Sequence, residues 1–300
     1  MKHLRFPVIL LLACMLLLFS CKSENENANN SRKPSVSKNT EGQEGWNEDE
    51  ESIIYLFPAP GEVLERFHNT EMAFEGTLLN PVTNKDQYLT TRSKALNLGI
   101  YFTDFAYAVV FERQQEAMDY LEVLEDLSTE VNITPTVYES LMERTETNIG
   151  KRDSLLNISR DMFFSILEFL EEGQMKSTMA LVSAGAYIEA MYVALQSVDE
   201  YKTDHPVLKH ITELRYPMNN LLERARATSN DPNVSSIVIY LVEISEIFDE
   251  LETMTAEPTV VKDSANAISI MGGSEKTMNR EEFLALREKI TEIRSNITGN

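Results

Sequence analysis

The chain has 300 residues, of which 48 are acidic and 27 are basic, and its formal net charge is −21 at pH 7. A chain this acidic repels phosphate backbones and anionic lipid headgroups, so we do not expect nucleic acid as a partner. Cys14 and Cys21 are its two cysteines, which excludes a disulfide-rich scaffold.

The first 20 residues have the parts of a bacterial secretory signal. Lys2 and Arg5 supply a positive n-region, and an apolar run follows from Phe6 to Phe19. A membrane-spanning helix needs about 20 predominantly apolar residues, and this run is shorter. We therefore predict a signal peptide over residues 1–20 rather than a permanent membrane span.

Leu18-Phe19-Ser20-Cys21 ends the signal and resembles the lipobox of bacterial lipoproteins, with an aliphatic residue at −3 and a small residue at −1. The resemblance implies diacylglyceryl transfer to the Cys21 sulfur, cleavage before this cysteine, and N-acylation. Cys14 leaves with the signal, so the mature chain keeps one thiol and has no internal disulfide. An ordinary signal peptide with a chance cysteine is the weaker alternative.

Residues 22–50 have the composition of a tether. They are rich in Ser, Asn, Lys, Glu and Gly, and Trp46 is their only large apolar residue. Such a stretch buries too little apolar surface to offset the entropy of ordering it. A lipidated Cys21 followed by this tether predicts a domain anchored in the bacterial cell envelope, at the outer membrane. The acidic residues after Cys21 loosely resemble a surface-export signal, and whether the domain faces the periplasm or the surface stays open.

From residue 51 onward, apolar residues recur at three- and four-residue spacing and glycine is scarce, which is typical of amphipathic helices. The first predicted helix begins after Pro60, and the others span about 86–112, 114–130, 134–148, 152–171, 174–200, 206–228, 232–248 and 280–296. The sequence therefore predicts an all-α domain over residues 51–300, a multi-helix bundle of about eight or nine antiparallel helices.

The stretch before the last helix has a different pattern. Thr259–Val261 and Ala267–Ile270 are short runs rich in β-branched residues, from which we predict a small β-hairpin. Asn279 and Glu282 then have the spacing of a capping box, which marks the start of the last helix.

Two of the most apolar predicted helices each carry one acid three residues before a tyrosine: Asp104 before Tyr107, and Glu189 before Tyr192. One hypothesis places Asp104 and Glu189 face to face in an interior pocket, where paired carboxylates bind a metal or a small molecule, or act as the acid and base of a hydrolase. The alternative is a hydrogen-bonded structural acid in each half of a duplicated bundle. The sequence favours this alternative because neither run contains His or Cys.

Other motifs do not indicate catalysis. Glu65 and His68 have the Glu-x-x-His spacing of di-iron bundles, but the sequence has no second copy, so we predict no metal site. Neither a phosphate-binding glycine loop nor a Gly-x-Ser-x-Gly elbow occurs. We therefore expect no cofactor and a non-enzymatic domain. Ser264, within Asp263-Ser264-Ala265, resembles the O-glycosylation sequon of Bacteroidetes-type envelopes and is a candidate modification site.

A helical-hairpin scaffold is a further alternative. The helix pair over residues 95–130 is faintly similar to a tetratricopeptide repeat, which has a period of about 34 residues. Gly99 and Gly185 hold corresponding places in two apolar helices but are separated by much more than this period.

Several features together resemble one family. The lipobox, the run Leu96-Asn97-Leu98-Gly99, Asp104 and the segment Ile268–Gly273 resemble uncharacterised all-helical envelope lipoproteins of Bacteroidetes-type bacteria. The resemblance implies an envelope location and a helical fold, and it implies no activity. We expect a membrane-anchored lipoprotein whose helical domain is a non-enzymatic binding or structural module, with an envelope protein as partner.

Overall fold

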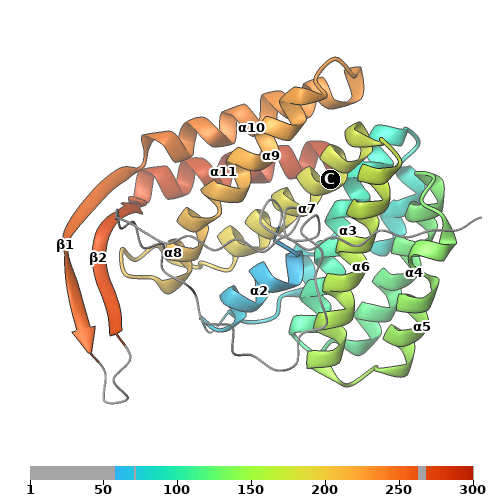
Figure 1. The fold of residues 1–300 in the computed structure, drawn as a ribbon, viewed down its shortest axis with the longest axis horizontal. Helices are drawn as coiled ribbons and strands as arrows, with labels where there is room; N and C mark the ends of the chain where they lie inside the picture. The colour runs from blue at the N-terminus through green and yellow to red at the C-terminus, as the bar shows by residue number, and fades with distance from the viewer. Residues whose placement is uncertain (1–57, 71, 263–267, 300) are drawn as a thin grey trace, which may run out of the picture. The chain divides into compact units, whose positions relative to one another are not determined.

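The computed structural model describes residues 58–70, 72–262 and 268–299, most of which are helical (Figure 1). In chain order the α-helices are α2 (Pro60–His68), α3 (Thr91–Val110), α4 (Gln114–Glu130), α5 (Glu139–Thr147), α6 (Arg152–Glu172), α7 (Lys176–Gln196), α8 (Pro206–Glu213), α9 (Arg215–Ala227), α10 (Pro232–Glu250) and α11 (Arg280–Thr298). We call them together the helical domain. The predicted helical fold is confirmed, although the described residues form ten α-helices rather than eight or nine.

Local capping signals place several helix starts where the sequence predicts them. Asn279 caps α11, and its side chain accepts hydrogen bonds from the backbone of Glu281 and Glu282 while the Glu282 carboxylate accepts from the Asn279 N–H. This is the predicted capping box, and it satisfies N–H groups that the first helical turn leaves without partners.

The extra helix comes from one proline. Residues 206–228, predicted as a single helix, divide into α8 and α9 at Leu214. Pro217 lies in the first turn of α9, where it lacks the N–H that would bond to the Glu213 carbonyl, and its ring crowds that carbonyl. The prediction of one helix was therefore wrong at this position.

The helix predicted from residue 86 begins later than expected. Residues Val82–Gln87 form a 3-10 helix, η2, and α3 starts only at Thr91. Thr90 forms a capping box with Ser93, since its hydroxyl accepts from the Ser93 N–H while the Ser93 hydroxyl accepts from the Thr90 N–H. This local pairing starts the helix at that point.

Between α10 and α11 the backbone forms a two-stranded antiparallel ribbon, β1 (Glu252–Lys262) and β2 (Ile268–Thr277). Its register is irregular around Pro258, which has no N–H to donate to a partner strand. The small hairpin predicted from Thr259–Val261 and Ala267–Ile270 is not supported, because the pairing extends well beyond these runs. Residues 263–267 lie outside the described residues.

Helices α3 and α7 form the centre of the helical domain and touch through their backbones. Figure 1 shows them between α4, α5 and α6 on one side and α9, α10 and α11 on the other. A Cβ atom on Gly99 would lie 2.0 Å from the Val182 carbonyl oxygen, and one on Gly185 would lie 1.9 Å from the Leu96 carbonyl oxygen. Only glycine fits at these two positions, so the pair sets how closely the two helices approach.

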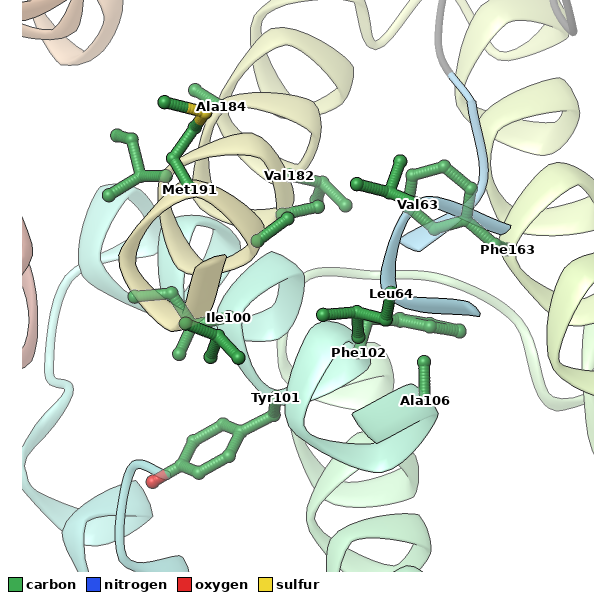
Figure 2. Packing of buried hydrophobic residues seen from close by; sticks show 14 of the residues in the cluster. Val63, Leu64, Ile100, Tyr101, Phe102, Ala106, Phe163, Val182, Ala184 and Met191 are labelled. Atoms are coloured by element: carbon green, nitrogen blue, oxygen red, sulfur yellow. The ribbon is translucent and has the colours of Figure 1, made fainter. Parts of the chain in front are cut away.

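Helix α7 is buried on nearly every face. It is the one helix of the described chain that is long and apolar enough to cross a membrane, yet 94% of its most apolar window is buried within the fold. Figure 2 shows Val182 of α7 among apolar side chains from α2, α3 and α6, including Leu64, Phe102 and Phe163. A helix that is apolar all round is expected at such a central position.

The close contact of α3 and α7 predicts the effect of adding one methyl group. Gly99→Ala should lower the free energy of unfolding by about 3 kcal/mol or more, because the new Cβ meets backbone that cannot move aside as a side chain does. Urea unfolding followed by circular dichroism measures the change.

Gly61→Ala is the matched control for this substitution. A Cβ on Gly61, in the first turn of α2, would lie 3.6 Å from a Leu156 methyl group and 3.8 Å from Ala106 Cβ, which is ordinary contact. Alanine also favours helix by up to about 1 kcal/mol over glycine. Equal unfolding midpoints for the two variants would contradict the proposed backbone contact.

Candidate functional site

One face of α3 carries polar side chains although the helix is buried on every side. These side chains recur at three- and four-residue spacing and so lie along one stripe. The stripe contacts the largely irregular segment 72–81. The Tyr107 hydroxyl accepts from Glu75 N at 2.9 Å and donates to Ala73 O at 3.2 Å. The Tyr101 hydroxyl donates to Pro81 O at 2.9 Å, and Asp104 Oδ2 accepts from Asn80 N at 3.1 Å. The polar residues of α3 therefore satisfy backbone groups that have no helix or strand partner.

The structure brings Asp104 and Glu189 together in the interior. Both residues have no exposed surface. Across the junction of α3 and α7 their carboxyl groups lie close enough for the Glu189 charge to raise the pKa of Asp104. The sequence hypothesis placed these two acids face to face. It did not include the third charged group that lies with them.

That third group is Arg294, on α11. Its Nε donates to Glu189 Oε2 at 2.9 Å, and its Nη2 donates to Glu189 Oε1 at 3.0 Å and to the Leu78 carbonyl oxygen at 2.9 Å. The guanidinium lies 4.4 Å from the centre of the Tyr192 ring. Paired hydrogen bonds of this kind are the strongest that arginine makes with a carboxylate, and here they join α7, α11 and the segment before α3.

The cluster contains two acids, Asp104 and Glu189, and one base, Arg294, so the protonation state of the acids determines its net charge. Glu189 is paired with Arg294, whereas Asp104 Oδ1 is buried and has no hydrogen-bond partner among the described residues. Burial raises the pKa of the Asp104 carboxyl well above its usual range, and the neighbouring Glu189 charge raises this pKa further. The Arg294 guanidinium and the Asn80 N–H lower it by less. We therefore expect Asp104 to hold a proton in the folded protein, which leaves the cluster without net charge.

This arrangement does not resemble an open catalytic site. Acid–base catalysis needs a carboxyl group within hydrogen-bond reach of a substrate. Here the neighbours are Asn80, Arg294 and the other acid, and all of these groups are buried. Across the described residues, no group of three or more His, Cys, Asp or Glu side chains could hold a metal ion.

The other predicted site residues have separate places. Tyr107 binds the backbone of segment 72–81, and Tyr192 lies against Arg294. Glu65 forms an ion pair with Arg152 at 3.1 Å, and the His68 ring packs edge-on against Phe111, so this pair faces different partners. Cys21 and Ser264 lie outside the described residues.

The sequence interpretation missed Arg294, although a signal was present. The apolar stripe of α11 consists of Phe283, Leu286, Ile290, Ile293 and Ile297. Arg294 follows Ile290 by four residues and precedes Ile297 by three, so it shares the buried face. A charged residue in an apolar stripe needs a buried partner of opposite charge.

Apart from the buried acid cluster, a groove lies on the surface between α2 and the pair α8 and α9. Its volume is about 530 Å³. The apolar part of its lining includes Pro58, Val63, Phe67, Leu214, Tyr216 and Pro217, and its charged part includes Glu62, Arg66, His210 and Glu213. We call it the α2–α9 groove. The sequence interpretation missed it because it depends on how α2 is placed against α8 and α9, which lie far from it in the chain.

Comparison of the chain with protein-family models, with curated proteins and with solved structures finds no significant match.

Arg294→Met tests the role of the ion pair. It should lower the free energy of unfolding by about 3–5 kcal/mol at neutral pH, because Glu189 is left buried with no counter-charge. Adding Glu189→Gln should restore part of the loss, since the double variant has no buried charge there. Urea unfolding gives both values.

The matched control is Arg287→Met on the same helix. Arg287 is half-buried and donates one hydrogen bond, to the Val198 carbonyl oxygen at 3.2 Å, so its loss should be about 1 kcal/mol. Similar losses for the two arginines would show that the buried pair has no special role.

Asp104→Asn tests the proton on Asp104. In the wild type the folded state keeps this proton while the unfolded chain releases it above about pH 4, so the free energy of unfolding falls as pH rises from there through the folded-state pKa. Asparagine keeps the shape but does not titrate. The variant should therefore gain stability relative to the wild type as pH rises above about 4, the usual pKa of an aspartate.

Urea midpoints at several pH values measure this difference, and Asp153→Asn is the control. The Asp153 side chain is 93% exposed, so this variant should differ from the wild type by a nearly constant amount. An Asp104→Asn profile that runs parallel to the wild type would mean that Asp104 is already ionised in the folded protein.

Proposed function

We propose that this protein is a lipoprotein of the bacterial cell envelope, anchored in the outer membrane through Cys21. A tether over residues 22–50 would link the anchor to an antiparallel multi-helix bundle that binds a partner protein and has no enzymatic activity. The lipobox Leu18-Phe19-Ser20-Cys21 supports the anchor, and the resemblance to helical lipoproteins of Bacteroidetes-type bacteria supports the location.

One observation carries the proposal of a non-enzymatic module. Glu189 is paired with Arg294, Asp104 accepts a hydrogen bond from the Asn80 N–H, and the neighbours of both acids are core groups. The proposal of a hydrolase or metal binder that uses Asp104 and Glu189 requires access that this burial does not provide. The acids then serve to hold α3, α7 and α11 together.

The tetratricopeptide alternative is also less well supported. In such arrays each repeat contacts only its neighbours in the chain. Here α3 packs both on α4, the next helix, and on α7, which lies four helices later. A continuous stack of hairpins does not have this central crossing.

The anchor is tested by Cys21→Ala in growing bacteria. The variant should lose labelled palmitate and should leave the membrane fraction, because each acyl chain contributes about 0.8 kcal/mol per buried CH₂ and no other lipid attachment is proposed. Cys14→Ala is the control and should keep its label, since this residue is predicted to leave with the signal. Palmitate on the Cys21→Ala chain would exclude this anchor.

The binding function and the orientation need intact cells. Protease added to whole cells should cleave the domain if it faces outward and spare it if it faces the periplasm. Crosslinking in intact envelopes, followed by capture of the chain, should then recover the same partner in repeated experiments. Repeated failure to recover one would contradict the proposed binding module while leaving the anchor unaffected.

A further inference from the structure

Ser183, on α7, has an unusual environment. It is 3% exposed, and its hydroxyl has no hydrogen-bond partner within the described part of the chain. Leaving a buried hydroxyl without a partner costs free energy, and most buried polar side-chain atoms have one. An occupant that brings its own polar atom to Ser183 would remove this cost.

The Ser183 side chain lines a small recess of about 30 Å³. The other lining groups are apolar, including Pro60, Phe163 and Leu221, apart from Tyr187, whose hydroxyl already donates to the Leu214 carbonyl oxygen at 3.1 Å. Figure 2 shows two of the lining residues, Val63 and Phe163, on neighbouring elements. A water needs about 10–15 Å³ by this measure, so the recess has room for one hydroxyl group and not for a ring.

The recess adjoins the larger α2–α9 groove. The two share Pro58, Val63, Leu214 and Pro217 as lining residues. A ligand that fills both therefore needs an apolar body for the groove and one hydroxyl at its inner end. An acyl chain does not fit this description, because it would place a methyl group at Ser183.

The outer part of the groove is charged. Arg66 and Glu213 form an ion pair across it at 4.0 Å, and His210 lies 3.3 Å from the same Glu213 carboxylate. Glu62 adds a further acid, so carboxylates exceed arginines among the lining residues. Basic side chains beside the apolar body would complement this edge and the acidic chain as a whole.

We propose that the α2–α9 groove binds a tyrosine side chain from a basic segment of a partner protein, with the ring in the groove and the phenol hydroxyl bonded to Ser183 Oγ. Tyrosine combines a large apolar ring with one polar end, which is why it is a frequent anchor at protein interfaces. The volume of about 530 Å³ lies in the range of ligand sites. The inference rests on the proposed binding module and does not depend on the lipid anchor.

The test compares two peptides that differ by one oxygen atom: acetyl-Lys-Lys-Tyr-Lys-Lys amide and its phenylalanine counterpart. Methyl NMR of the full chain should show shifts at Val63, Leu214 and Leu221. The tyrosine peptide should bind several-fold more tightly than the phenylalanine peptide to the wild type, as expected for one net hydrogen bond.

Ser183→Ala is the decisive variant. It should reduce this preference for tyrosine to about one, while its urea midpoint stays at or above that of the wild type because an unpaired hydroxyl is removed. A lowered midpoint would show that Ser183 already has a partner, which would overturn the proposal. The same preference in Ser183→Ala and wild type would also overturn it.

A third probe distinguishes a partner's side chain from a free phenolic ligand. If p-cresol shifts the same methyl signals and the tyrosine peptide does not, the groove takes a small molecule and the proposed partner segment is wrong. If neither probe shifts them, the groove is not a phenol site. Neither result contradicts the proposed function itself, which is tested separately by crosslinking to partners at other surfaces and by palmitate labelling at Cys21.

Discussion

The backbone contact between α3 and α7 is the constraint on which the rest of this fold depends. Gly99 and Gly185 lie where each helix crosses the other, and any side chain there would occupy the position of the opposing backbone. Because the axes approach so closely, the remaining faces of both helices must be covered by other elements, which α2, α4, α6 and α11 provide. The two central helices are buried on nearly all sides for this reason.

The same contact explains the polar centre. Asp104 and Glu189 follow the two glycines by five and four residues, about one turn further along each helix, so the crossing brings the two acids together. Two buried carboxylates cost free energy, and the cost is offset by the hydrogen bonds from Arg294 to Glu189 and from the Asn80 N–H to Asp104. The cluster in turn ties α11 and segment 72–81 to the core, although these lie at opposite ends of the helical domain in sequence.

The interior acids and the surface groove have different roles in the proposed function. The interior acids, which a sequence reader would first suspect of chemistry, have structural partners. Concave surface occurs where α2 meets α8 and α9. In the small recess beside it, Ser183 is a buried hydroxyl without a partner among the described residues. A binding module with a rigid polar core and a groove at its edge agrees with the proposed envelope lipoprotein. Its tether would leave the groove free to meet partners away from the membrane.

The sequence by itself determined features that depend on neighbours in the chain. The capping box at Asn279, the bounds of α4 and the apolar stripes follow from spacing within a few residues, and the lipobox at Cys21 remains a prediction of the same local kind. Only the tertiary structure decided which acids are paired and where a groove forms. Arg294 and Glu189 are 105 residues apart and meet because α11 packs on α7, just as Asp104 and Glu189 meet because two glycines let α3 and α7 pack closely. Spacing within a few residues contains no information about either contact.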